Sequence, residues 1–271
     1  MQTISEKEIE NFNTNGYIIL DVIDKNKLSL LRTSLAKTIA ISLGKYLPEK
    51  YKNFKYSEKE EDFILNSGMI ELEKKNHKYL TDIYNQMPSS TFFYDIISDK
   101  KISSSINLLL GRDKNSNLYT DNTSMRMDTP GITPWIYGWH TDKSAGIPKS
   151  KFIQLWAPFT GRVEKNLGGL NVIKDSHKKK VKTEDDAIVR KLILSGEHAR
   201  PRLDNKVIGA NNKNEEIELF CEWGEGIFFN SNLMHKSGIN KSTDRIRYVF
   251  TCFYHELYNP EWEFTIFKGK T

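Results

Sequence analysis

Hydrophobic residues in the first 110 positions recur at helical spacing. Between residues 24 and 43, leucine and isoleucine return every three or four positions, a pattern that predicts one long amphipathic helix. A capping box at residues 5–8 predicts a short helix ahead of it. The hydrophobic run at residues 17–20 predicts a strand between these two helices. Residues 68–110 continue with helical spacing, so the first part of the chain is expected to be mostly helical.

The pattern changes after Gly111. Short hydrophobic runs, several of them alternating, are separated there by glycine and proline turns, which is typical of a β-sandwich or jelly roll. An acidic and apolar stretch at about residues 181–203 predicts a helix inserted into this β core. We therefore expect an α+β chain with a mainly β core. Residues 1–110 would pack on one outer face of residues 111–271, so that residues 1–271 form a single domain. The expected strands are 119–127, 135–140, 152–158, 170–173, 217–220, 226–229 and 247–254.

The composition narrows the class of protein. The 271 residues include 40 basic and 35 acidic side chains, a net charge of only +5, and the lysines are scattered instead of forming a basic face with aromatic residues. The 2 cysteines make no disulfide framework. The N-terminus lacks the apolar core of a signal peptide, and no apolar run reaches the ~18 residues of a membrane span. We expect a cytoplasmic protein that binds neither nucleic acid nor a membrane, with its oligomeric state left open. The small positive excess is compatible with an anionic small substrate but does not require one.

The candidate chemistry lies in the β region, at His140 and Asp142. Alternate residues of a strand point to the same side, so this pair can present an imidazole and a carboxylate together. With 6 histidines and 35 acidic residues, about one His-x-acid pair is expected by chance, so the pair alone also fits a hydrogen-bonded strand histidine followed by a turn. His235 follows a distant strand and could be a third ligand, and two histidines with one carboxylate suit iron(II). Arg245 or Arg247, leading into the last strand, could give a carboxylate two parallel hydrogen bonds.

Several segments, taken in order, resemble the phytanoyl-CoA dioxygenase family of iron(II)- and 2-oxoglutarate-dependent oxygenases. The likeness runs from residue 5 to about residue 255. The matching segments are 15–20, 130–131, 139–142, 154–156, 168–173, 176–178 and 226–242. This resemblance implies a double-stranded β-helix, the cupin-like form of the jelly roll. It also implies Fe(II) as cofactor, with 2-oxoglutarate and O2 as cosubstrates.

The resemblance further implies roles for individual residues. The two histidines and the aspartate named above would bind Fe(II), and an arginine at the last strand would hold the distal carboxylate of 2-oxoglutarate. The family's usual spacing from the second histidine falls on Ile246. Aligning residues 244–247 on the family's Asp-Arg-x-Arg selects Arg247 for this role and leaves Arg245 as the alternative.

Other residues are candidates for contacts with the cosubstrate or the substrate. Trp156 and Ser242 fall where the family lines the cosubstrate pocket, although Trp156 fits simple core packing equally well. Arg126 precedes the first metal ligands and Lys143 follows them, so either could meet an anionic substrate, whereas a solvated side chain is the plainer reading. Two further lysines that could meet an anionic substrate in the same way are Lys149 and Lys151. The histidines expected to be structural or exposed are His77, His177, His198 and His255.

The reaction that the resemblance implies is that of a 2-oxoglutarate-dependent dioxygenase, an oxidoreductase. It would convert 2-oxoglutarate and O2 to succinate and CO2 while hydroxylating an unactivated C–H bond of a small-molecule metabolite. The same cofactors could instead support desaturation, epimerisation or cyclisation. An inactive jelly-roll protein that only binds a small molecule is the alternative of another class, and the intact ligand set disfavours it. Asp142 argues against the halogenating relatives, in which a small residue replaces the carboxylate.

Overall fold

A computed structural model describes residues 4–131, 138–143, 150–178 and 216–256. Helices dominate the first part of the chain and strands the rest, as the hydrophobic pattern predicted. The α-helices are α1 (Glu6–Asn15), α2 (Lys25–Tyr46), α3 (Pro48–Tyr51), α4 (Glu61–Phe63), α5 (Met69–Lys75), α6 (His77–Gln86), α7 (Thr91–Ile97) and α8 (Lys100–Leu109). The other helical segments are η1 (Glu58–Glu60), the π-helical η2 (Ile64–Gly68), η3 (Met87–Ser89) and η4 (Ser176–Lys178). The strands are β1 (Tyr17–Asp21), β2 (Tyr119–Asp128), β3 (Phe152–Pro158), β4 (Leu170–Ile173), β5 (Glu216–Leu219), β6 (Glu225–Asn230), β7 (His235–Ser237) and β8 (Arg247–His255). The helix expected near residues 181–203 lies outside the described residues.

The first two helices begin at side-chain caps. At the start of α1, the Glu8 amide donates to the Ser5 hydroxyl at 3.3 Å, and the Ser5 amide donates to the Glu8 carboxylate at 2.6 Å. At the start of α2, Asp24 accepts hydrogen bonds from the next helical amides. These contacts satisfy amides that a first helical turn leaves without partners. None of the helices in the described part of the chain combines the length and the hydropathy needed to cross a lipid bilayer. The predicted apolar face of α2 is buried and consists of Leu28, Leu31, Leu35, Ile39 and Leu43.

The strands form two antiparallel sheets that pack against each other. The larger sheet has the order β1-β6-β3-β8-β2, and the smaller sheet has the order β5-β4-β7. Strands β2 and β3 lie in the larger sheet and β4 and β5 in the smaller one, and β6, β7 and β8 then alternate between the two sheets, as in a jelly roll. A bridge between His140 and His235 places residue 140 beside β7 in the smaller sheet. The predicted fold class is confirmed. In contrast, β7 was not among the predicted strands, and only residues 138–140 of the strand expected at 135–140 are described.

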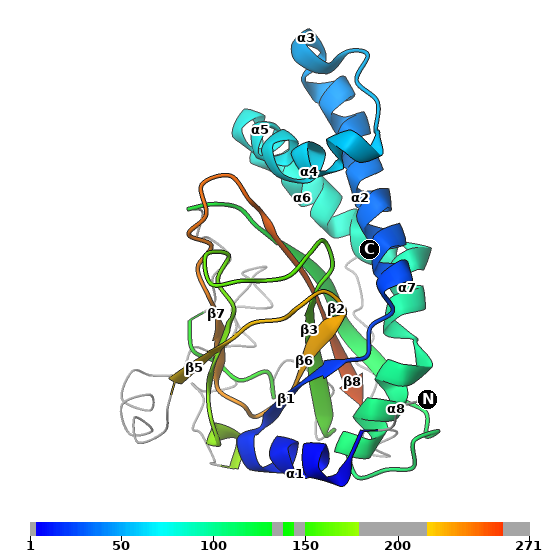
Figure 1. Ribbon diagram of the computed structural model, residues 1–271, viewed down its shortest axis with the longest axis vertical. Helices are drawn as coiled ribbons and strands as arrows, with labels where there is room; N and C mark the ends of the chain where they lie inside the picture. The colour runs from blue at the N-terminus through cyan, green and yellow to red at the C-terminus, as the bar shows by residue number, and fades with distance from the viewer. Residues whose placement is uncertain (1–3, 132–137, 144–149, 179–215, 257–271) are drawn as a thin grey trace, which may run out of the picture.

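The larger sheet is covered on both faces. All 7 residues of β3 and all 9 residues of β8 are buried. Ile153 and Leu155 belong to the hydrophobic cluster that contains the helices, whereas Trp156 packs with Val172 and Leu219 of the smaller sheet. Because side chains alternate along a strand, odd positions of β3 face the helices and even positions face the barrel interior. Figure 1 shows α2, α7 and α8 along one side of the strands, so the helices pack on one outer face, as expected.

A tight glycine turn precedes β4. Gly168 has a φ of +73°, a left-handed conformation that residues with a Cβ rarely adopt. A Cβ at this position would lie 2.5 Å from the carbonyl oxygen of Ile239, because the β7–β8 loop crosses close to the turn.

We expect Gly168→Ala to lower the free energy of unfolding by about 2 kcal/mol. Chemical denaturation would measure the loss, with Gly161→Ala as the control because nothing lies within 4 Å of a Cβ there. Equal stability of the two variants would contradict the close crossing.

Candidate metal centre

Three polar side chains meet at one end of the barrel. His140 lies in the bridge beside β7, Asp142 follows it, and His235 is the first residue of β7. The amides of the two histidines each donate to the carbonyl oxygen of the other residue at 3.0 Å. The Asp142 amide donates to the carbonyl oxygen of Ser231 at 3.1 Å. Strand pairing therefore places the two histidines side by side, although they are far apart in the sequence.

The ligand atoms of these residues form a compact and buried group. One atom from each residue lies within 4.8 Å of the other two. The carboxylate oxygens of Asp142 lie 3.8 Å from Nε2 of His140 and 3.3 Å from Nε2 of His235. The exposed fraction is 4% for each histidine and 0% for the aspartate. A carboxylate removed from water to this degree is stabilised by a nearby cation.

Backbone carbonyl groups determine which nitrogen of each imidazole can bind a metal. Nδ1 of His140 lies 2.7 Å from the carbonyl oxygen of Gly138, and Nδ1 of His235 lies 2.9 Å from that of Leu233. A carbonyl oxygen only accepts hydrogen bonds, so each Nδ1 carries the proton. Each Nε2 therefore presents a lone pair, and both of these atoms face Asp142. Such hydrogen bonds orient metal-binding histidines in proteins generally.

The donor set fits iron(II). Two imidazole nitrogens and one carboxylate oxygen are the ligands of non-haem iron(II) oxygenases. Three protein ligands leave coordination positions for small molecules, which a closed structural site with four protein ligands does not. Within the described ranges, this is the one group of three or more His, Cys, Asp or Glu side chains close enough to share a metal ion.

A second charged cluster lies inside the barrel, where β2 ends and β8 begins. Nε and Nη2 of Arg247 donate to Oδ2 of Asp128 at 3.1 and 2.8 Å, and its Nη1 donates to the carbonyl oxygens of Gly168 and Gly238 at 2.5 and 3.0 Å. Nη2 of Arg126 lies 3.3 Å from the other carboxylate oxygen. Burial alone would raise the pKa of Asp128, but the charges of Arg126 and Arg247 outweigh burial and hold this pKa below its ordinary value. The cluster therefore carries two positive charges and one negative charge.

Strand β7 links the two charged groups. His235 begins this strand, and Gly238, whose carbonyl accepts from Arg247, directly follows it. Three residues of extended chain correspond to about 10 Å. The guanidinium of Arg247 therefore lies on the order of 10 Å along β7 from the metal-ligand candidates.

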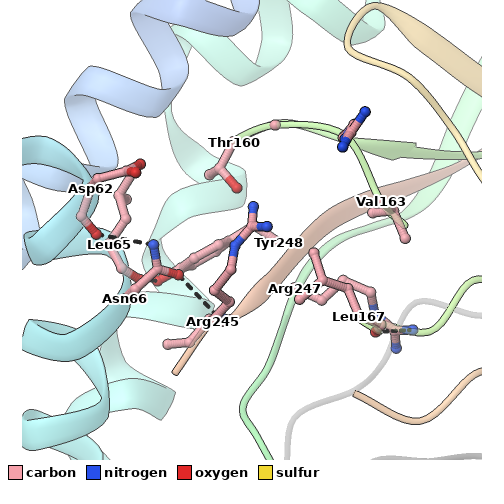
Figure 2. A pocket seen from close by; sticks show the side chains of 12 residues that line it. Asp62, Leu65, Asn66, Thr160, Val163, Leu167, Arg245, Arg247 and Tyr248 are labelled. Atoms are coloured by element: carbon pink, nitrogen blue, oxygen red, sulfur yellow. Dashed lines mark hydrogen bonds between the residues drawn. The ribbon is translucent and has the colours of Figure 1, made fainter. Parts of the chain in front are cut away.

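The alternative arginine, Arg245, lies outside the barrel. Its side chain is 44% exposed, and its Nη1 donates to Glu164 at 2.9 Å. Figure 2 shows the side chains of Arg245 and Arg247 extending in different directions, with Arg247 reaching toward Leu167. Both arginines line a pocket between residues 62–66 and the start of β8, and none of the three metal-ligand candidates lines it, so the pocket does not separate the two arginines but their exposure does. Of the two arginines, Arg247 is the one inside the barrel.

The remaining candidate residues fall in different places. Trp156 lies on the inner face of β3 and is 3% exposed, within the hydrophobic cluster between the sheets. Ser242 closes the β7–β8 loop, because its hydroxyl contacts oxygen atoms of that same loop. Lys143 is exposed immediately after the first metal ligands. Lys151 is exposed just before β3, and Lys149 lies outside the described residues.

The other described histidines make contacts away from the metal centre. His77 pairs with a carboxylate on α5, and His177 contacts a backbone carbonyl oxygen near the end of α1. His255 is buried at the end of β8, where its ring lies 4.5 Å from that of Phe152. His198 lies outside the described residues.

Sequence reasoning did not single out Asp128 or Gln154, two polar residues of the barrel interior. Asp128 begins the turn sequence Asp-Thr-Pro-Gly, so it was interpreted as a turn residue and not as a charged residue of the barrel interior. A signal existed, because Arg126 and Asp128 are two residues apart and so share one strand face. Gln154 is two residues from both Phe152 and Trp156 and so shares their strand face, where it is the polar residue between two aromatic ones.

Comparisons with known proteins identify the family and the fold of the chain. A model of the phytanoyl-CoA dioxygenase (PhyH) family matches residues 12–249, and no curated protein sequence matches the chain. Among solved structures, EctD from S. alaskensis with 2-oxoglutarate and 5-hydroxyectoine is similar, with a TM-score of 0.60 and 18% identity over 93% of this chain and 76% of that chain. The epimerase SnoN in complex with Fe3+, alpha ketoglutarate and nogalamycin RO has a TM-score of 0.59 and 12% identity over 93% of this chain and 83% of that chain. The carbocyclase SnoK from nogalamycin biosynthesis has a TM-score of 0.54 and 14% identity over 93% and 84%. At these identities the structural likeness shows a shared fold.

Proposed function

The chain belongs to the phytanoyl-CoA dioxygenase family, whose oxygenases use Fe(II), 2-oxoglutarate and O2, and from this premise we propose that it hydroxylates a C–H bond of a small-molecule substrate. The coproducts would be succinate and CO2. The observation that carries this proposal is the buried group of His140, Asp142 and His235, whose ligand atoms lie within 4.8 Å of one another. This group supplies the donor set of non-haem iron(II) and leaves positions for the cosubstrates.

The two histidines and the aspartate would have different roles in holding the metal. Each imidazole binds through Nε2 while its Nδ1–H is held by a backbone carbonyl, which keeps both rings in the binding orientation. Asp142 contributes the negative charge that lowers the charge of the bound ion. Burial of all three side chains keeps bulk water away from the reacting centre. When bound, iron would allow O2, the oxidant, to be reduced by two electrons from 2-oxoglutarate and two from the C–H bond.

The cluster of Arg126, Asp128 and Arg247 is the proposed site for the distal carboxylate of 2-oxoglutarate. Its net charge of one positive unit inside the barrel favours a single anion. The distance of about 10 Å along β7 is one that a five-carbon diacid bound to the metal can bridge with a terminal hydrogen bond. Arg247 alone cannot give the distal carboxylate the two parallel hydrogen bonds that the sequence predicted. Four of its five N–H groups already bond Asp128, Gly168 and Gly238. We propose that the carboxylate is shared between Arg126 and the remaining N–H of Arg247.

The structural comparisons support the choice of cofactors. EctD was crystallised with 2-oxoglutarate and 5-hydroxyectoine, and SnoN with Fe3+ and alpha ketoglutarate. Each alignment covers 93% of this chain, so the barrel that holds the charged groups is included. Because an epimerase and a carbocyclase also share this fold, product analysis has to separate hydroxylation from the other outcomes.

The test begins with the purified protein, Fe(II) and 2-oxoglutarate in the absence of O2. We expect the charge-transfer absorption band of a metal-bound 2-oxo acid. Admission of air should then release succinate, faster when a substrate from a metabolite library is present. The product should gain one oxygen atom, as shown by mass spectrometry. A jelly-roll protein that only binds small molecules would give no succinate, and a product of unchanged mass or of two hydrogens less would exclude hydroxylation.

A further inference from the structure

Gln154 is a buried polar residue that the proposed reaction does not yet use. Its side chain is 4% exposed, and its Oε1 accepts no hydrogen bond from any residue that the structure describes. The neighbouring positions Ile153 and Leu155 pack against the helices, and Trp156 packs inside the barrel. Since side chains alternate along β3, Gln154 faces the interior on the same side as Trp156. Native proteins leave few buried polar atoms without a partner, so this amide points to a ligand.

Aromatic side chains surround this amide on the inner face of the larger sheet. Phe229 of β6 and Phe253 of β8 are its cross-strand neighbours. The ring of Phe152 stacks on that of Phe253 at 4.8 Å. The ring of Phe229 lies edge-on, 4.7 Å from the imidazole of His235. Gln154 is therefore a direct neighbour of Phe229, whose ring contacts the candidate ligand His235. The other side chains named around Gln154 are aromatic.

Gln154 lies closer to the metal end of β3 than to the end that pairs with the start of β8. The carbonyl of Phe152, at the start of β3, accepts from the Ser231 amide at 3.4 Å, and the Ser231 carbonyl accepts from the Asp142 amide at 3.1 Å. The start of β3 thus lies at the metal end of the barrel, two residues before Gln154. In contrast, the proposed path of 2-oxoglutarate leads from the metal toward Arg247, which lies at the opposite end of β8. At neutral pH 2-oxoglutarate carries only accepting oxygens, so the group that donates to Oε1 of Gln154 belongs to a different molecule, the one being oxidised.

From this geometry we propose that Gln154 determines the orientation of the primary substrate. Its Oε1 accepts a hydrogen bond from an N–H or O–H group of the substrate, while the aromatic side chains around it contact an apolar part of the same molecule. The substrate class is therefore a largely apolar or ring-containing molecule with a hydrogen-bond donor next to the carbon that is oxidised. This inference rests on the proposed function and adds a specificity-determining residue to it.

The experiment compares the wild-type protein with Gln154→Met, Gln154→Glu and the exposed control Gln86→Met. Methionine keeps the length of the side chain and removes the hydrogen bond, whereas glutamate keeps an accepting oxygen. Two measurements are made on each protein: an anaerobic titration of the Fe(II)-loaded protein with 2-oxoglutarate by its charge-transfer band, and substrate-stimulated succinate release against a metabolite library. For each active compound, the ratio of product to succinate reports how well the substrate is positioned.

We expect all four proteins to bind 2-oxoglutarate within about twofold of one another. Gln154→Met should lose at least about 50-fold in kcat/KM for the wild-type substrates and release succinate without product, whereas Gln154→Glu should recover part of the activity, most for donors that carry positive charge. Unchanged kcat/KM and coupling in Gln154→Met would overturn the inference. A tenfold weaker binding of 2-oxoglutarate in that variant would also overturn it, because Gln154 would then belong to the cosubstrate site. Absence of the charge-transfer band in the wild-type protein would instead refute the proposed function itself.

Discussion

Replacing His235 by alanine is expected to abolish iron binding and turnover together. The variant removes one of two neutral nitrogen donors and leaves one imidazole and one carboxylate, too few ligands to hold iron(II) at micromolar concentration. Loss of a residue that only supports a ligand typically weakens a metal site about 10–100-fold, so loss of the ligand itself should exceed about 100-fold. Iron content after anaerobic reconstitution, the charge-transfer band with 2-oxoglutarate and succinate release should all fall.

The loss should not come from unfolding. The backbone amides and carbonyls that pair His235 with His140 are independent of the imidazole, so the strand pairing can persist in the variant. Denaturation curves of His235→Ala and of the control His77→Ala, whose side chain is 45% exposed on α6, would check this. A folded His235→Ala protein that still loads iron and releases succinate at the wild-type rate would refute the metal centre.

Arg247→Met is expected to weaken both the fold and the binding of 2-oxoglutarate. The substitution leaves the fully buried carboxylate of Asp128 with only Arg126 as its cationic partner among the described residues, and breaking a buried ion pair costs about 3–5 kcal/mol. It also removes a positive charge from the site proposed for the distal carboxylate. We expect a lower denaturation midpoint and at least about a 30-fold loss of affinity for 2-oxoglutarate, equivalent to about 2 kcal/mol, in the anaerobic titration.

Asp128→Asn is the matched variant for this second prediction. It breaks the same ion pair but leaves both arginines and raises the net charge of the cluster by one unit. The protein should lose stability, whereas its affinity for 2-oxoglutarate should stay the same or increase. The depressed pKa of Asp128 means that its ion pairs stabilise the fold above the ordinary carboxyl pKa and are lost only as the pH falls through the lower, folded-state value. If Arg247→Met bound 2-oxoglutarate as tightly as the wild-type protein, the cluster would have no part in cosubstrate binding.

The sequence contained most of what positions the metal ligands. The apolar face of α2 and the capping box of α1 follow local rules of spacing and capping, and the structure confirms both. The alternation of β3 could be predicted because Phe152 and Trp156 are four residues apart, an even spacing that puts both on one face of a strand. His140 and Asp142 were found by the same period, and the structure places His235 beside them. These features depend on residues close in sequence or on a motif that the family keeps in order.

Features that depend on distant pairing were harder to predict. Strand β7 has only 3 residues and a polar sequence, so its pairing with β4 and His140 is imposed by the barrel and not by propensity. The ion pair of Asp128 with Arg247 joins β2 to β8, and no local pattern links the two positions. The burial of Gln154 could not be recognised until the smaller sheet was known to pack over the inner face of β3.

The carbonyl groups that accept from the two imidazoles hold both nitrogen donors of the candidate site in place through the main chain. Little reorganisation should then accompany loading, and other divalent ions will compete for the same three atoms. Affinity for such a site rises from manganese through iron and cobalt to nickel. Whether the site holds iron would therefore depend on which divalent ions are available to the protein. Nickel or cobalt should bind tightly in place of iron and leave the protein without oxygenase activity.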